Sequence, residues 1–216
     1  MKRPLALAGA GLMFAAALAA HQGLRAQENE QPVATEGLRP VSEFATIADP
    51  RARSVALFEE AGKVILHPRC VNCHPATERP LQGMAMVPHQ PPVVRGEADF
   101  GVPGMTCNTC HGPENVELIA QADGLESIPG HPEWHVAPIE MAWENRTLGE
   151  ICLQIKDVNR NGGKDMAELV AHMAEDSLVG WGWNPGKGRE PAPGTQQQFG
   201  EIFKAWADSG AECPPA

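Results

Sequence analysis

Cys70-Val71-Asn72-Cys73-His74 recurs 37 residues further along the chain as Cys107-Asn108-Thr109-Cys110-His111, and these two stretches decide what kind of fold the sequence can form. Each reads Cys-x-x-Cys-His, the attachment signature of c-type haem. Two thiols at this spacing can each form a thioether with a haem vinyl group, and the next imidazole can reach the iron. The sequence therefore predicts two covalently attached haem c groups, tethered by Cys70, Cys73, Cys107 and Cys110, with His74 and His111 as iron ligands.

Three other interpretations compete with haem: a zinc ribbon, a thioredoxin-like redox disulfide and two structural disulfides. None of them explains why a histidine directly follows both cysteine pairs. Thiols in an exported protein would also tend to pair with one another rather than wait for a metal.

The N-terminus predicts export. Lys2 and Arg3 precede an apolar run from Leu5 to Ala20, which is the pattern of a signal peptide over residues 1–26, with cleavage after Ala20 or Ala26. We expect a periplasmic protein with a flexible segment over residues 27–48. No later segment is apolar enough to cross a membrane, so no span is expected after cleavage.

Composition narrows the function further. The 216 residues include 17 Lys and Arg against 27 Asp and Glu, a net charge of -10 that is unsuited to nucleic acid. Cleavage after Ala26 would make the charge more negative, because it removes three basic residues. Glycine (22) and proline (20) are abundant, and aromatic residues make up only 5%, so a large cofactor would supply bulk that the side chains lack.

Helical signals flank the two motifs. Asp49-Pro50 begins a helix that Pro68 ends, and capping patterns at residues 147–150, 165–168 and 195–198 begin three more. No alternating strand pattern of useful length is present. We expect a mainly α fold, with cytochrome c-like helices and long irregular loops around two haems. Residues 49–216 would form one dihaem domain, with the haem-binding part at 49–146 and a helical part at 147–216.

The remaining cysteines, Cys152 and Cys213, have no histidine after them. In an exported chain a disulfide between them is expected, and it would tie the C-terminus to the helical part.

Further histidines are candidates for the sixth iron position. His89 lies between the motifs in a proline-rich frame and is the first choice, for the haem of Cys70 and Cys73. His135 is the second choice, with Met141 close behind, and His172 is the third. A hydrogen-bonded or solvent-facing histidine is the alternative for each of them. His67 and His131, each beside a proline, are interpreted as turn residues.

Several stretches resemble one group of exported dihaem cytochromes c. Besides the two motifs and His89, they are Arg79 to Gly83, Val93 to Gly96, Trp134 to Pro138 and Gly180 to Gly186. Members of that group are often labelled as a subunit of isoquinoline 1-oxidoreductase, a molybdenum hydroxylase. Residues 67–111 are also similar to the dihaem small subunit of periplasmic nitrate reductase, in which a histidine between the motifs is a haem ligand. The long C-terminal half departs from that second pattern.

The resemblance implies an electron-transfer protein with no catalytic residue of its own. It would carry single electrons from an exported molybdopterin and iron-sulfur hydroxylase to the respiratory chain. Because the chain is acidic, the partner is expected to present a basic docking patch. The alternative is a dihaem enzyme, peroxidase-like, with one open iron site.

Overall fold

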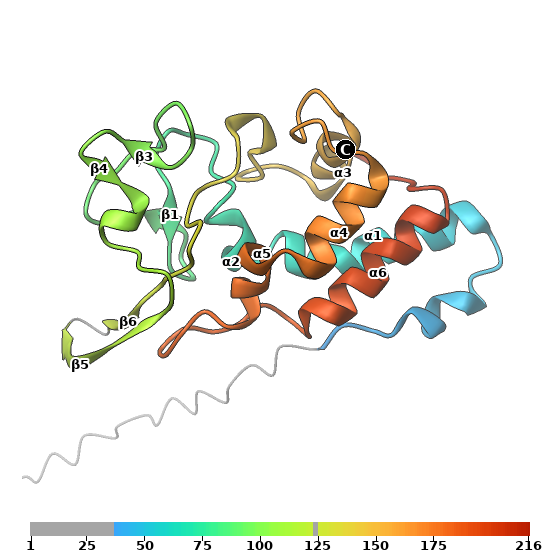
Figure 1. Cartoon of the computed structure of the whole chain (residues 1–216). Coiled ribbons are helices and arrows are strands. Elements are labelled where there is room, and N and C mark those ends of the chain that lie inside the picture. The colour runs from blue at the N-terminus through green and yellow to red at the C-terminus, as the bar shows by residue number, and fades with distance from the viewer. Residues whose placement is uncertain (1–36, 123–124) are drawn as a thin grey trace, which may run out of the picture. The chain divides into compact units, whose positions relative to one another are not determined.

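A computed structural model describes residues 37–122 and 125–216, which belong to one compact unit that runs from Thr35 to Ala216 (Figure 1). The chain is helix-rich, 41% helical and 9% strand, with small sheets, in keeping with the expected mainly α class. The predicted signal peptide, 1–26, and the first part of the 27–48 segment lie outside the described residues. No described helix has the length and apolar character needed to cross a membrane.

Four longer helices form where the sequence predicts them. They are α1 (Pro50–Ile65), α3 (Leu148–Lys156), α4 (Met166–Glu175) and α6 (Gln196–Asp208). The shorter turns are η1 (Val41–Thr46), α2 (Pro68–Val71), η2 (Cys107–Thr109), η3 (Ile139–Met141), α5 (Ser177–Gly180) and η4 (Trp181–Trp183).

Side-chain caps explain where these helices begin. The Asp49 carboxylate accepts a hydrogen bond from the Ala52 amide, and Pro50 occupies the first turn of α1, where no amide donor is needed. Three reciprocal capping boxes begin the others: Thr147 with Glu150 at α3, Asp165 with Glu168 at α4, and Thr195 with Gln198 at α6. In each box two otherwise unpaired amides gain an acceptor.

The hydrophobic core is centred on α6, which packs against both α1 and α4. The Phe58 ring of α1 lies 4.7 Å from the Trp206 ring of α6. Gly200 of α6 lies so close to α4 that a Cβ there would come within 2.5 Å of the Ala174 Cβ. The parts before and after residue 147 therefore share one core, because α1, from the first part, packs against α6 of the second.

The segment before α1 is also more ordered than expected. Residues 37–48, predicted to be flexible, bury the Leu38 and Phe44 side chains against the core. The Arg39 Nε donates to the Glu60 carboxylate at 2.8 Å, and the Arg39 guanidinium lies over the Phe44 ring. Val41 and Ile47 pack against the same core, so apolar side chains along the whole segment anchor it.

Three two-stranded antiparallel sheets depart from the expectation of no strands. They are β1 (Leu81–Gln82) with β2 (Val87–Pro88), β3 (Gly101–Val102) with β4 (Met105–Thr106), and β5 (Val116–Ala122) with β6 (Leu125–Ile128). The first two are tight hairpins of two residues per strand, too short to produce an alternating pattern. They organise the irregular chain between residues 75 and 146.

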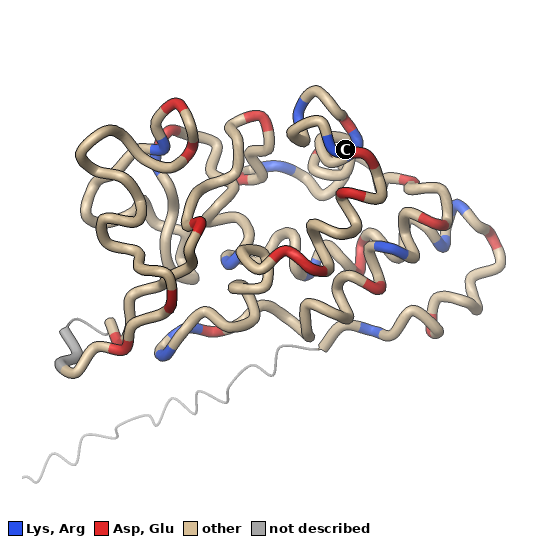
Figure 2. The backbone as a smooth tube through the Cα atoms, viewed as in Figure 1, with Lys and Arg blue, Asp and Glu red and all other residues tan. Residues whose placement is uncertain are grey.

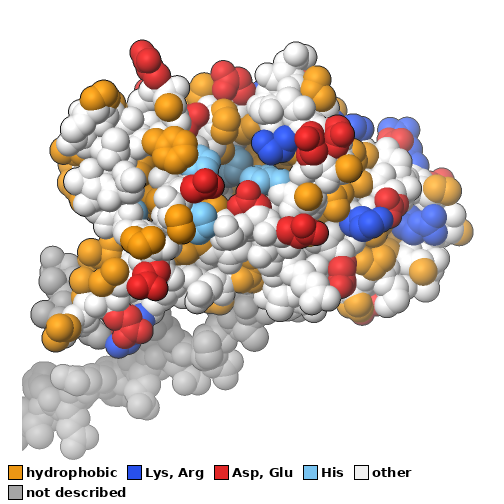
Figure 3. Space-filling model, viewed as in Figure 1, with side chains coloured by type: hydrophobic (Ala, Val, Ile, Leu, Met, Phe, Trp, Pro, Cys, Tyr) orange, Lys and Arg blue, Asp and Glu red, His pale blue; other side chains and the backbone are white. Residues whose placement is uncertain are grey.

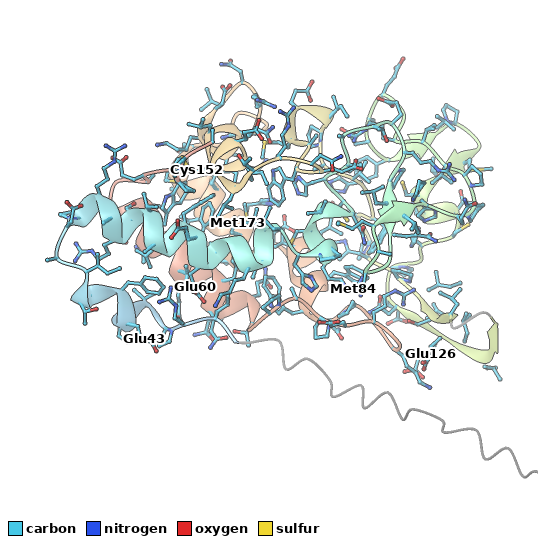
Figure 4. The ribbon with its side chains drawn as sticks, turned by 180° about the vertical axis from the view of Figure 1, so that it is seen from behind. Glu43, Glu60, Met84, Glu126, Cys152 and Met173 are labelled. Carbon is cyan, nitrogen blue, oxygen red and sulfur yellow. A yellow bond between two sulfur atoms is a disulfide. The ribbon has the colours of Figure 1, made fainter. Side chains whose placement is uncertain are left out.

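Cys152 and Cys213 form the expected disulfide, with a sequence separation of 61 (Figure 4). Cys152 is fully buried on α3. Close packing supports the same attachment, because a Cβ at Gly149 would overlap the backbone of Pro214 and Pro215. The C-terminal tail is thus fastened to α3 by both a covalent bond and backbone contact.

Candidate haem sites

Both Cys-x-x-Cys-His motifs fold into a single helical turn. In the first, the Cys73 amide donates to the Cys70 carbonyl at 3.1 Å, and the His74 amide donates to Val71. In the second, the Cys110 amide donates to the Cys107 carbonyl at 3.3 Å. A helical turn places residues three and four apart on one side, so each turn presents two thiols and an imidazole together. The two motifs reach this conformation from different flanking structure, after α1 in one case and after β4 in the other.

Each motif histidine is oriented by a backbone carbonyl. His74 Nδ1 lies 2.7 Å from the Met141 carbonyl oxygen, and His111 Nδ1 lies 2.8 Å from that of Pro129. A carbonyl can only accept, so Nδ1 carries the proton and Nε2 keeps a free lone pair. This is the arrangement in which a histidine binds a metal through Nε2 while its other nitrogen is held by an outer partner.

A tryptophan lies against each of these imidazoles. The Trp143 ring stacks on His74 with centroids 3.6 Å apart and an interplanar angle of 7°. The Trp134 ring stacks on His111 at 4.7 Å and 15°. Both contacts restrict rotation of the imidazole about its side-chain bonds. Each motif histidine is thus held by a hydrogen bond to a backbone carbonyl and by a stacked tryptophan ring.

The ionisation of these groups suits covalent attachment and ligation. Burial lowers the pKa of His74 to about 4, an effect opposed by the Met141 carbonyl, so the ring is neutral at pH 7. Burial also lowers the pKa of His111. A neutral imidazole is the form that binds a metal.

The same burial acts on the thiols of the first motif. It raises the pKa of Cys70 to about 12 and that of Cys73 to about 11. All four motif cysteines are unpaired. A redox disulfide needs a low thiol pKa for reactivity, so Cys70 and Cys73 do not have the character of a thioredoxin-like pair.

The zinc interpretation also lacks its site. Within residues 37–122 and 125–216, no group of three or more His, Cys, Asp or Glu side chains is arranged to hold a metal ion. A zinc ribbon would bring the four motif cysteines around one point. Nearness of the Cys107 thiol contributes to the raised pKa of Cys73, so the two motifs are neighbours, but they do not converge.

Arg95 fastens the loops around the first motif. Its guanidinium, only 3% exposed, donates to the carbonyls of Pro75, Thr77 and Ala137 and pairs with Asp99. Pro75 directly follows His74. One side chain therefore holds together the exit from the first motif and the segment that leads to the carbonyl partner of His74.

Two buried donors beside the first motif have no acceptor among the described residues: Arg95 Nε and Trp143 Nε1. An unpaired buried donor is costly, and its usual explanation is a group that the protein binds. The carboxylates of a haem are acceptors of that kind. The free Nε2 atom of His74 and these two donors are groups that a haem at the first motif would use, so the residues present are compatible with one there.

His89 lies beside the second motif and not the first. Its ring centroid is 6.0 Å from that of His111, with an interplanar angle of 64°. His89 Nδ1 contacts the Pro91 carbonyl oxygen at 3.0 Å, which leaves Nε2 as its free nitrogen. Two imidazoles that share one metal at about 2 Å each have centroids about 6 Å apart. The sequence favoured the haem of Cys70 and Cys73 for His89, whereas the structure places the His89 ring beside His111. Ligation of either haem by His89 stays a prediction.

Of the other candidates, His172 lies near His74 and His135 lies near His172. The charge of His172 lowers the pKa of His74, and that of His135 lowers the pKa of His172, in both cases after burial as the larger cause. Figure 3 shows histidine side chains collected in a hollow of this face. The Nδ1 atoms of both candidates are already engaged, by the Glu133 carbonyl for His135 and by Asp176 for His172. Met141 contributes its backbone carbonyl to His74.

Sequence reasoning missed four residues of these sites: Met141 and Pro129 as carbonyl partners, and Trp143 and Trp134 as aromatic walls. Every residue has a carbonyl, so no sequence signal distinguishes the two that are used. The two tryptophans offered a signal, because they are among only five in the chain and both lie in the segment after the second motif.

No protein-family model, curated protein or solved structure matches this chain. The function therefore has to be inferred from the geometry of the two motifs.

Proposed function

We propose that this protein is an exported dihaem c-type cytochrome that carries single electrons between a dehydrogenase and the respiratory chain. The proposal rests on the local structure that the two motifs share. Each places two thiols and an imidazole on one helical turn, and each imidazole has its Nδ1 fixed by a carbonyl and its Nε2 free. If the two Cys-x-x-Cys-His sequences had arisen by chance, their histidines would not be expected to share this hydrogen bond from Nδ1 to a backbone carbonyl.

In this proposal Cys70, Cys73, Cys107 and Cys110 tether two haem c groups, and His74 and His111 bind the irons. When bound, the haems supply a one-electron couple, and the protein supplies position and electrostatics. The Met141 and Pro129 carbonyls hold the histidine protons at Nδ1. No side chain needs to act as an acid, base or nucleophile.

The sixth positions divide between two groups of histidines. We assign His89 to the iron at His111, on the basis of their 6.0 Å ring spacing. For the iron at His74, His172 is the first candidate because its charge acts on His74, and His135 is the second because its charge acts on His172. Two histidines on each iron would leave no open coordination site, which favours electron transfer over catalysis.

The electron donor that we propose is an exported molybdenum hydroxylase with a basic docking patch, on the resemblance described above and on the acidic charge of the chain. The test is to isolate the protein from its periplasm with any associated dehydrogenase and to add that enzyme's substrate. Reduction of both haems, with low-spin spectra throughout, is the expected result. A high-spin component in the isolated protein would favour the peroxidase-like alternative, and failure of the enzyme to reduce either haem would remove the hydroxylase assignment.

A further inference from the structure

The β5–β6 hairpin is connected at both ends to residues of the second motif's site. β5 begins at Val116, five residues after His111, and β6 ends at Ile128, one residue before Pro129. Pro129 is the residue whose carbonyl accepts the hydrogen bond from His111. Both ends of the hairpin therefore adjoin His111 and its carbonyl partner Pro129 (Figure 1). A molecule bound to the hairpin would lie next to the second motif.

This hairpin exposes large apolar side chains. Val116 and Leu125 are about half exposed, and Ile119 is fully exposed. Single exposed apolar residues are ordinary on a protein surface. Here Val116, which pairs with Ile128, and Leu125, which pairs with Ala122, lie on opposite faces, so both faces of this short hairpin expose apolar side chains. The hairpin makes its own backbone pairing, so these side chains are not required to hold its strands together.

The same region is strongly acidic. Residues 96–145 contain nine Asp and Glu and no Lys or Arg. Among the residues that the structure describes, Glu114, Glu117 and Glu133 are exposed and form no salt bridge. In Figure 2 the chain around β3 to β6 carries acidic positions and few basic ones, whereas the helices carry both signs. Two basic side chains also lie against β6, since Lys187 pairs with Glu126 and Arg189 donates to Ser127.

The second motif is also closer to solvent than the first. No residue of η2 is buried, and Cys110 is exposed. In the first motif, by contrast, Val71 and Asn72 are buried. Electron transfer between proteins needs close approach of the two redox groups, so the more exposed site is the better point of exchange.

We infer that the hairpin surface, defined by Glu114, Val116, Glu117, Ile119, Leu125 and Glu133, is the docking site for a redox protein whose own exchange site has an apolar centre and a rim of lysines. Electrons then pass between that partner and the chain at the haem of Cys107 and Cys110. This inference rests on the proposed function. Charge attraction brings the two proteins together, and the apolar side chains are covered when the complex forms.

The test compares two triple variants with the same change in charge. The docking variant combines Glu114→Gln, Glu117→Gln and Glu133→Gln. The control variant combines Glu43→Gln, Glu59→Gln and Glu201→Gln, which are exposed acidic residues on η1, α1 and α6. Glu43 and Glu126, the latter on β6, lie at opposite ends of the view in Figure 4, so the control charges are removed far from the hairpin.

The first measurement is the rate at which hexaammineruthenium(II), a cationic reductant, reduces each haem-loaded variant. At low ionic strength the docking variant should react roughly fourfold more slowly than the unmodified protein, and the difference should disappear in concentrated salt. The control variant should change by less than about 1.5-fold. Ferrous EDTA, an anionic reductant, should show the opposite dependence.

The second measurement is carbodiimide cross-linking to a lysine-rich monohaem cytochrome c, used as the protein probe. Cross-links should map to Glu114, Glu117 or Glu133, and Ile119→Ser should reduce their yield while leaving the reaction with hexaammineruthenium(II) unchanged.

Equal slowing of the control and docking variants, or cross-links that map to the helices, would overturn the inference. A protein that carries no haem would instead overturn the proposed function, and its absorption spectrum would reveal this before any kinetics.

Discussion

His89→Ala provides a sharp test of the second site, because we propose His89 as the sixth ligand of the iron at His111 and not of the iron at His74. The two ring centroids of His89 and His111 are 6.0 Å apart, close to the roughly 6 Å that a shared metal requires. Alanine removes the only imidazole found at that distance from His111 among the described residues. One of the two irons should lose its sixth ligand, so half of the haem should become high-spin.

The assay is absorption and electron paramagnetic resonance spectroscopy of the oxidised protein, with His131→Ala as the matched control. His131 is also a half-buried histidine in the irregular region, but its two ring nitrogens are already engaged by Ser177 and the Glu133 amide. The control should stay fully low-spin. A second comparison starts from a variant in which Cys107 and Cys110 are alanine, where adding His89→Ala should leave the remaining haem unchanged.

Two results would refute this reasoning. An unchanged low-spin spectrum in His89→Ala would show that His89 is not a ligand. A high-spin signal that persists in the variant without the second haem would show that His89 serves the first haem, as the sequence alone suggested.

Three further predictions concern stability, measured by denaturant unfolding of the haem-loaded protein. Replacing Cys152 and Cys213 by alanine should cost about 4 kcal/mol, because the disulfide closes a loop of 61 residues, and a loss below about 1 kcal/mol would contradict this. Gly200→Ala should cost about 1–3 kcal/mol by forcing α6 away from Ala174, whereas alanine at an exposed α6 position such as Gln197 should cost less than about 0.5 kcal/mol. Burial would raise the pKa of Glu60, but hydrogen bonds from Lys63 and Arg39 outweigh it and lower the pKa. The contribution of Glu60 to the free energy of unfolding should therefore be complete above about pH 4.5 and be lost as the pH falls through the lowered pKa. Glu60→Gln should make the fall of stability with pH less steep, and an equally steep fall in the variant would contradict this.

Local chemistry allowed much of the helical fold to be predicted. Caps such as Thr147 with Glu150 act within four residues, so the sequence contains all the information that sets the start of α3. The pairing of Cys152 with Cys213 followed by elimination, since the other four cysteines belong to the motifs. The α1 start at Asp49 and Pro50 was visible for the same local reason.

What the sequence did not reveal depends on contacts between distant segments. Phe44 is buried because α1 and α6 provide a surface for it, and nothing near residue 44 indicates that surface. The position of His89 beside His111 was also not foreseen, because chain order places His89 between the two motifs, whereas the structure brings its ring within 6.0 Å of the His111 ring after the β1–β2 hairpin. The carbonyl partners of His74 and His111 are 67 and 18 residues away, and backbone atoms leave no trace in a sequence.

The difference between the two sites is a structural result with functional consequences. The first motif follows α1 and is held by Arg95 among buried carbonyls. The second motif lies at the surface, beside an acidic hairpin. A carrier with one internal and one exposed haem would receive and release electrons at different rates at its two ends, and the exposed end would determine which partners it accepts.

Intact-mass spectrometry of the exported protein tests the central claim most directly. The account predicts a mature chain, lacking its signal peptide, that carries two covalently attached haems, one on the peptide with Cys70 and Cys73 and one on the peptide with Cys107 and Cys110. A chain that carries a single haem or none when it is expressed with a functional c-type haem attachment system would contradict the account.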